Sequence, residues 1–214
     1  MDRTIHTANF YLDLELAYRF FNARLFSGSL PACLITLQRK HGVGGFFAAN
    51  RFGQRDQREY VHEIALNPTL FADQTESRIL SILVHEMCHV WQHECGKPAR
   101  GRYHNREWAR QMLSIGLNPS HTGKPGGRFT GDRMDHYIVG GGLFDRVCDE
   151  LLATGSVVRY VERDSGNPVV RERKRASKSP YCCENCELKV WGKPGIKVRC
   201  EDCDVIMVGT ASIR

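Results

Sequence analysis

Apolar side chains recur every three to four residues in two long stretches of the chain, which is the period of an amphipathic helix. Residues 9–31 repeat leucine and phenylalanine at this spacing, and Gly28 and Pro31 end the repeat. Residues 76–93 do so again behind Thr75, a residue type that caps helices. The pattern predicts one long helix at the start of the chain and a second, mostly buried one near its middle.

Shorter elements surround these two helices. Helical spacing indicates further helices over residues 105–115 and 143–153. β-Branched and aromatic residues favour strands over 32–39, 44–52 and 59–68. The chain is therefore predicted to contain both helices and strands.

A Gly/Pro-rich connection, residues 116–142, is unusually long for a compact domain, and loops of this length are commonly functional or mobile. A further strand is predicted over 156–163, just before the composition becomes basic and then cysteine-rich. We therefore expect a first domain over 1–157, a basic linker over 158–179 and a small terminal module over 180–214.

The chain's 214 residues can bury a substantial core, and its 42% hydrophobic and 25% charged residues are ordinary for a soluble globular protein. The longest apolar run, Ile79 to Val84, falls far short of the roughly 20 residues that a membrane helix needs. The N-terminal residues mix acids into their apolar positions and lack the apolar core of a signal peptide. We therefore expect a cytoplasmic protein that does not bind membranes.

The net charge of +6 is unevenly distributed. Residues 1–150 hold 18 basic against 16 acidic side chains, residues 151–180 hold 7 against 3, and residues 181–214 hold 5 of each. Most of the excess thus lies in the middle segment, whose basic run attracts polyanions, nucleic acid first. A solvated linker with a charge bias is the alternative interpretation. The side chains that would bind nucleic acid are Arg171, Arg173, Lys174 and Arg175.

Three histidines and two glutamates lie in residues 85–96, HEMCHVWQHECG, on the second long helix. His85 and His89 are four residues apart, so a helix presents both imidazoles on one face, where they can bind one metal ion. Glu86 is rotated by about 100° and is badly placed as a third ligand, but it can reach a water at the open metal position. A zinc-activated water attacks a carbonyl while the carboxylate takes the proton as general base. From composition alone, HExxH is expected roughly 0.02 times here, which favours a metal site.

A third ligand has to come from further along the chain. His93 continues away from the face of the first pair and is interpreted as a packing or solvated side chain. His104 directly precedes a predicted helix, and the glycines and proline before it allow the chain to return to the metal. Glu107 is the competing ligand, because some zinc peptidases take a glutamate from a later helix.

Five of the nine cysteines crowd the end of the chain, which favours metal ligation over a secreted disulfide scaffold. Cys183, Cys186, Cys200 and Cys203 form two Cys-x-x-Cys pairs, the ligand pattern of a structural zinc ribbon. Cys182 could replace Cys183, but only Cys183 repeats the spacing of the second pair. We therefore expect two zinc ions per chain, one catalytic and one structural.

The stretches HEMCHVWQ and YHNREWARQMLSIGL, with FNARLFSGSLPACLITL upstream, resemble the SprT-like family of zinc metallopeptidases, whose eukaryotic relative is a DNA–protein crosslink protease. The resemblance covers most of residues 9–153 and, more loosely, the cysteine-rich end. It implies an α+β fold, in which a small zincin-like domain packs the HExxH helix on a short mixed sheet and a zinc ribbon follows. It also implies three zinc ligands, His85, His89 and His104, with Glu86 as the catalytic base.

These observations predict a zinc-dependent endopeptidase that cleaves DNA-associated or DNA-crosslinked proteins at the nucleoid, with single-stranded or distorted DNA as its partner. One alternative is a non-proteolytic zinc- and DNA-binding regulatory module on a zincin scaffold, and another is a metallohydrolase of a non-protein substrate. An intact Glu86 argues against the scaffold. If strand 59–68 bordered the cleft as an edge strand, it would favour a peptide substrate.

Two pairs of aromatic side chains have two interpretations each. His136 or Tyr137 could support the transition state of the reaction, or both could be structural. Tyr181 and Trp191 could stack on nucleic-acid bases, or each could belong to the small core of the ribbon.

Overall fold

The computed structural model describes residues 5–53, 55, 59–155, 157–162 and 178–209. The chain divides into two compact units, Met1–Arg163 and Asp164–Arg214. Most of the expected basic linker, including 171–177, lies outside the described residues, so the predicted domain boundaries stay a prediction. Within the described part of the chain, none of the helices combines the length and apolar character needed to span a bilayer.

The first unit is a mixed α+β structure with small sheets. Its α-helices correspond to the four predicted from periodicity, with ends shifted by a few residues. The elements in chain order are α1 (His6–Leu25), β1 (Cys33–Leu37), β2 (Gly45–Gly53), β3 (Tyr60–Leu66), a 3₁₀ helix η1 (Pro68–Asp73), α2 (Glu76–Cys95), α3 (Arg106–Ser114), β4 (Leu117–Ser120), β5 (Asp135–Ile138) and α4 (Leu143–Leu152).

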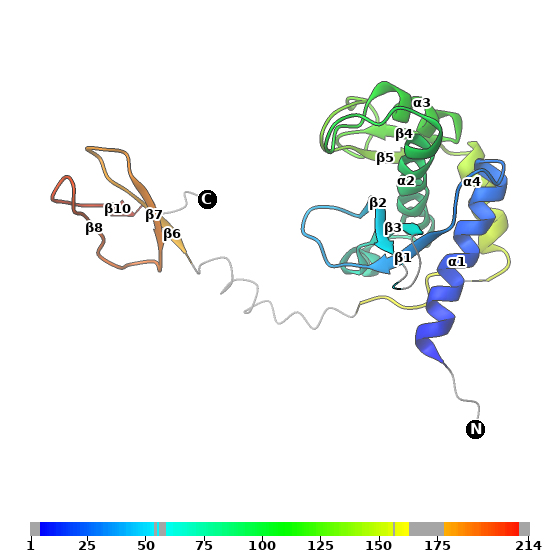
Figure 1. Ribbon diagram of the computed structural model, residues 1–214, viewed down its shortest axis with the longest axis horizontal. Helices are drawn as coiled ribbons and strands as arrows, with labels where there is room; N and C mark the ends of the chain where they lie inside the picture. Colours follow the sequence, from blue (N-terminus) through cyan, green and yellow to red (C-terminus); the bar gives the residue numbers. More distant parts are fainter. Residues whose placement is uncertain (1–4, 54, 56–58, 156, 163–177, 210–214) are drawn as a thin grey trace. The chain divides into compact units, whose positions relative to one another are not determined.

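Helix α2 runs through the middle of this unit, with α1 and α4 on one side and the three-stranded sheet near its other side (Figure 1). Thr75 caps it as predicted, since its hydroxyl oxygen accepts the backbone N–H of Arg78 at 3.2 Å. The helix buries Leu80, Leu83 and Met87 completely, each of which contributes about 1.5–3 kcal/mol through the hydrophobic effect. Its polar motif is therefore held on a rigid, buried element.

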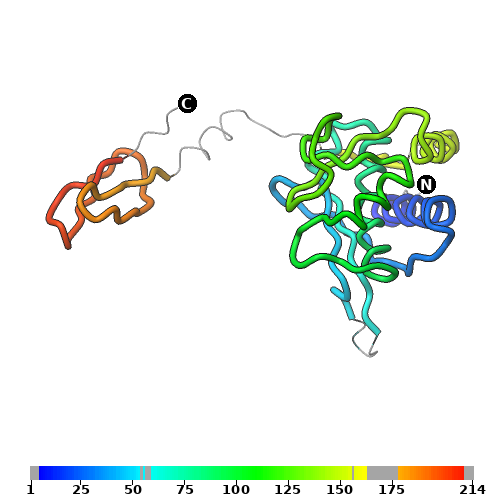
Figure 2. The backbone as a smooth tube through the Cα atoms, turned by 90° about the horizontal axis from the view of Figure 1, so that it is seen from above, coloured from blue at the N-terminus to red at the C-terminus, as the bar shows by residue number. Residues whose placement is uncertain are grey.

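The larger sheet has the strand order β1-β3-β2. Strand β3 pairs parallel with β1 and antiparallel with β2, so β3 is the central strand. The condition that residues 59–68 form an edge strand is not met, because both sides of β3 are paired. The edge strands are β1 and β2. Strand β2 has an irregular register between Ala48 and Phe52 and projects with β3 from the body of the unit (Figure 2).

Residues 116–142 contain more structure than their Gly/Pro content indicated. Strands β4 and β5 pair antiparallel across this segment, with Pro119 opposite His136. The predicted strand over 156–163 does not form within its described residues, 157–162. The backbone N–H groups of Val157 and Val158 instead donate to a carboxylate oxygen of Glu76, so they are not available to a neighbouring strand.

The second unit consists of two small sheets. One has the order β10-β6-β7 and the other is the hairpin β8-β9. Its buried core contains Tyr181, Cys183, Cys200 and Met207. So small a core rarely folds without a cross-link or a metal ion. The strands are β6 (Ser179–Cys182), β7 (Lys189–Gly192), β8 (Arg199–Cys200), β9 (Val205–Ile206) and β10 (Val208–Gly209).

Candidate functional site

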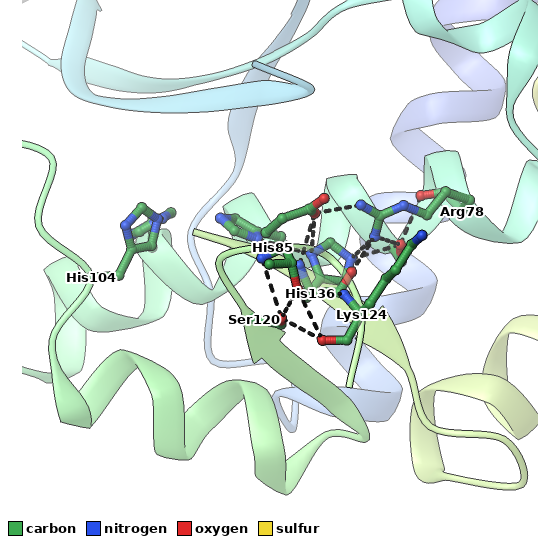
Figure 3. Close-up of polar contacts among 10 residues, drawn as sticks. Arg78, His85, His104, Ser120, Lys124 and His136 are labelled. Carbon is green, nitrogen blue, oxygen red and sulfur yellow. Dashed lines mark hydrogen bonds and ion pairs between the residues drawn. The ribbon is translucent and has the colours of Figure 1, made fainter. Parts of the chain in front are cut away.

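Three histidines from two segments meet on one face of α2. His85 and His89 lie one turn apart on α2, and His104 reaches them from the segment before α3 (Figure 3). One ring nitrogen from each of the three lies within 4.8 Å of the others. Two restraints hold the backbone at His104. It exchanges two hydrogen bonds with the backbone of Gly131, and the next residue, Asn105, caps helix α3. The structure thus brings together the three predicted ligands.

The donor set and spacing of these histidines fit a zinc ion. Two nitrogens bound tetrahedrally at about 2.0–2.1 Å would lie about 3.3 Å apart, and Nε2 of His89 lies 3.1 Å from Nε2 of His104. Burial lowers the pKa of His89 to about 3 and moves the pKa values of His85 and His104 in the same direction. The rings are therefore neutral at physiological pH, which is the form that binds metals.

Trp108 forms the floor under the three histidines. Its indole is fully buried, stacks on His89 with ring centroids 5.4 Å apart, and meets the rings of His104 and His85 edge-on at 4.4 and 4.8 Å. These contacts restrict the imidazoles to a narrow range of orientations. Sequence reasoning overlooked Trp108, although its position four residues after His104 places both on one side of the start of α3.

Glu86 lies buried beside the histidines, against strand β2. The backbone N–H of Phe47 donates to its carboxylate, and burial raises the pKa of Glu86 to about 8. Gly45 makes this approach possible, because a Cβ there would lie 2.8 Å from the Ala65 carbonyl oxygen and 3.1 Å from Oε1 of Glu86. A glycine inside a strand marks such a close approach, which is the sequence feature that could have located this contact.

Glu107, the alternative third ligand, is not part of the histidine group. Its Oε2 accepts the backbone N–H of Lys97 at 2.7 Å and an amide N–H of Gln92 at 2.9 Å. These hydrogen bonds lower the pKa of Glu107. Its carboxylate stabilises the turn after α2. Of the two candidates for the third ligand, His104 lies with His85 and His89, and Glu107 does not.

A second histidine group, formed by His62, His93 and Glu94, also has metal-ligand spacing. The backbone N–H of Asn50 donates to Nδ1 of His62 at 2.9 Å. A neutral His62 therefore carries its proton on Nε2, which donates to Glu94 at 3.0 Å. That nitrogen has no free lone pair for a metal. His93 packs against the rings of His62 and Phe47, in line with its interpretation as a packing residue.

His136 and Tyr137 lie next to each other on β5 but in different surroundings. His136 is 1% exposed, and its Nδ1 lies 3.1 Å from Nδ1 of His85 on the side away from the other ligands (Figure 3). Its Nε2 contacts Arg78 and Ser81. Tyr137 is partly exposed and pairs with Asn118. A transition-state role stays a prediction for both residues, and His136 has protein partners at both ring nitrogens.

The four predicted ribbon cysteines form the other metal-ligand group. The sulfur atoms of Cys183, Cys186, Cys200 and Cys203 lie within 4.8 Å of one another, and those of Cys186 and Cys200 are 3.6 Å apart. Tetrahedral zinc with bonds of about 2.3 Å would place two sulfurs about 3.8 Å apart, so the spacing fits. Cys182 lies outside the group, and its thiol points to the Cys183 carbonyl oxygen at 3.6 Å.

This geometry predicts opposite results for two adjacent substitutions. Cys183→Ser should remove the metal from the ribbon and unfold it, because the remaining core is too small to fold alone. Cys182→Ser should leave both metal content and fold intact. Elemental analysis and circular dichroism of the two variants test this. If Cys182→Ser lost the metal and Cys183→Ser retained it, Cys182 would be the ligand.

The residues predicted to bind nucleic acid are only partly described. Arg171, Arg173, Lys174 and Arg175 lie outside the described residues. Of the two aromatic residues, Tyr181 is buried, and its hydroxyl donates to the Lys193 carbonyl oxygen. Trp191 is 67% exposed, so it alone is accessible to a base.

A model of the SprT-like family matches residues 14–124, just over half of the chain. The matched range includes all three histidines and Glu86. An uncharacterized protein in the mucB 3' region of Salmonella typhimurium is 47% identical over 58 residues, which are 27% of this chain and 78% of that protein. No solved structure matches the chain.

Proposed function

The chain belongs to the SprT-like family, and we propose that it is a zinc-dependent endopeptidase whose catalytic zinc is held by His85, His89 and His104 in a zincin-like arrangement. The observation that supports this most strongly is the convergence of three neutral imidazoles beside one buried carboxylate, Glu86. Three protein ligands leave a fourth position open, as in catalytic zinc sites.

A zinc ion in this position supplies a Lewis acid that polarises a peptide carbonyl and acidifies a water. Glu86 supplies the general base. Its carboxylate takes a proton from the attacking water and delivers it to the amine that leaves. The hydrogen bond from the Phe47 N–H fixes the orientation of the carboxylate. A pure scaffold would have no need of a carboxylate held in this way.

The strand beside Glu86 supports a peptide substrate over a small molecule. Strand β2 is an edge of its sheet, and no strand among the described residues pairs with its outer backbone groups. An extended polypeptide can pair with such an edge through main-chain hydrogen bonds, which bind without requiring a particular sequence. Strand β2, rather than residues 59–68, would therefore pair with an extended peptide substrate.

We further propose that the substrates are proteins bound or crosslinked to DNA. The excess of basic residues in 151–180 and the exposed Trp191 both suit a nucleic-acid strand, through phosphate contacts and base stacking respectively. DNA binding by these parts would raise the local concentration of DNA-bound proteins at the protease without any new contact in its site. The ribbon would hold the second, structural zinc ion.

Cleavage of a DNA-bound protein should then be stimulated by single-stranded DNA, and the stimulation should fall steeply with salt because phosphate contacts release counterions. A Lys174→Ala/Arg175→Ala variant should weaken this response and flatten its salt dependence. Fragment formation, measured with and without DNA over a range of salt concentrations, tests the prediction.

The matched control is Arg19→Ala/Arg24→Ala, which removes the same charge from α1. It should respond to DNA like the native protein. Equal cleavage with and without DNA at low salt would leave a peptidase without a DNA partner. No Glu86-dependent fragments under any condition would contradict the peptidase itself.

A further inference from the structure

The β4–β5 segment contacts two of the three site histidines through their Nδ1 atoms. Nδ1 of His104 lies 3.1 Å from the Gly131 carbonyl oxygen, and Nδ1 of His85 lies 3.1 Å from Nδ1 of His136. Both contacts come from residues beyond 124, where the match to the family model ends. In a neutral imidazole, the nitrogen that carries the proton cannot bind a metal, so these contacts decide which nitrogen is free.

The contact of His104 has one solution. A carbonyl oxygen only accepts hydrogen bonds, so Nδ1 of His104 carries the proton and donates it to Gly131. Nε2 keeps its lone pair and faces Nε2 of His89. His104 is thus already in the tautomer that a metal ligand needs.

The contact of His85 has two solutions, because either ring can hold the shared proton. If Nδ1 of His136 holds it, His85 is the acceptor and carries its own proton on Nε2, which then cannot bind a metal. If Nδ1 of His85 holds it, Nε2 of His85 is free and the proton of His136 moves to its Nε2. The surroundings of His136 therefore decide whether His85 can be a ligand.

Nε2 of His136 has a suitable acceptor for the second arrangement. Ser81 Oγ lies 2.8 Å away, and its own hydroxyl proton is donated to the Arg78 carbonyl oxygen at 2.7 Å, so Oγ can accept. Nη1 of Arg78 also lies 2.7 Å from Nε2 of His136, which suits the first arrangement. A guanidinium only donates, so the second arrangement requires the contact between Nη1 and Nε2 to lengthen. Nη1 can then donate to the His136 carbonyl oxygen, now 3.0 Å away, and to Ser81 Oγ, now 3.3 Å away. With that shift, every donor in the second arrangement has an acceptor.

We propose that His136 is a positioning residue that holds His85 in its metal-binding tautomer when zinc is bound, through a directed relay from His85 to His136 to Ser81. The β4–β5 segment thereby orients two of the three proposed metal ligands. An ion pair between Arg78 and Asp135 fastens β5 to α2 and keeps the relay aligned. The proposal rests on the proposed zinc site and assigns a role to residues 116–142.

The test measures zinc affinity of the full-length protein by competition with a chelator. Loss of an outer partner of a ligating histidine typically weakens metal binding about 10- to 100-fold. His136→Leu, which removes the acceptor, should show a loss of this size and a changed visible absorption spectrum when Co²⁺ replaces zinc. His136→Gln should recover much of the affinity, since its amide can accept from His85 and donate to Ser81. The zinc equivalent that His89→Ala no longer binds is the one assigned to the histidine site.

Ser81→Ala tests the relay without altering either ring, and alanine is well tolerated in a helix. Zinc affinity should fall here too, because His136 then loses its acceptor and the first arrangement is favoured. The double variant Ser81→Ala/His136→Leu should be no weaker than His136→Leu alone, since both act through one relay. Tyr137→Phe, on the same strand, is the matched control and should bind zinc like the native protein.

The outcomes separate this proposal from the one on which it rests. If the native protein binds zinc at the histidines and both His136→Leu and Ser81→Ala bind it equally well, the positioning role is wrong and the zinc site stands. If the native protein fills only the cysteine site, the proposed function and the positioning role both fail. Thermal unfolding of the metal-free variants shows whether a lost affinity reflects a lost fold, and a loss confined to unfolded variants counts against the relay.

Discussion

Glu86→Gln is expected to lower the rate of peptide hydrolysis by about 10²- to 10⁴-fold while leaving the zinc content unchanged. Glutamine has the shape of glutamate and its amide oxygen can still accept the Phe47 N–H, so the local fold should persist. An amide cannot take a proton from water, however, so the base is lost. The ratio kcat/KM for a protein substrate and the zinc content by elemental analysis are the two measurements.

The matched control is Glu59→Gln, the same change at an exposed glutamate outside the site. It should leave both quantities as they are. Full turnover by Glu86→Gln would exclude this carboxylate as the base. Loss of zinc together with turnover would instead make Glu86 a ligand, contrary to its position against β2.

Local periodicity was sufficient to predict the helix that carries His85 and His89. The apolar repeat, the cap at Thr75 and the spacing of His85 and His89 all depend on residues close in sequence, and one rigid element carries them. For the third ligand, the residues alone left His104 and Glu107 both open, because each lies near the start of the helix that follows α2. The resemblance to the SprT-like family favoured His104.

The order of the strands was not predictable in this way. Residues 60–66 look alike whether they form a central or an edge strand, since the pairing depends on β1 and β2 rather than on the strand itself. The same holds for Val157 and Val158, which are β-branched like strand residues but donate to Glu76, far away in the sequence. In both segments, partners far away in the sequence determine the backbone hydrogen bonds.

The contacts behind the three histidines were equally hidden from sequence reasoning. His136 lies 51 residues after His85, beyond a segment rich in turn residues, and nothing in the local pattern indicates that the two rings meet. Only the pairing of β4 with β5 and the contacts of Arg78 bring them together. Residues that contact a metal follow motifs, whereas those that orient the ligands follow the packing of each particular chain.

His104→Ala should lower the zinc content from two equivalents to about one, because two imidazoles alone bind zinc weakly and the cysteine site is unaffected. His89→Ala should have the same effect. Proteolysis should fall to background in both variants, and elemental analysis after dialysis against a mild chelator measures the loss. The removed ring also contacts Trp108, so circular dichroism should accompany the measurement to verify that α3 is intact.

Glu107→Gln is the control that decides between the two candidate third ligands. Its amide oxygen can still accept the Lys97 N–H, so the turn after α2 should persist, and the zinc content should remain at two equivalents. If Glu107→Gln lost zinc and His104→Ala retained it, the glutamate would be the ligand. That result would require the turn after α2 to rearrange on metal binding, since its carboxylate is fixed there by Lys97 and Gln92. The geometry described above predicts the reverse, with His104 indispensable and Glu107 replaceable.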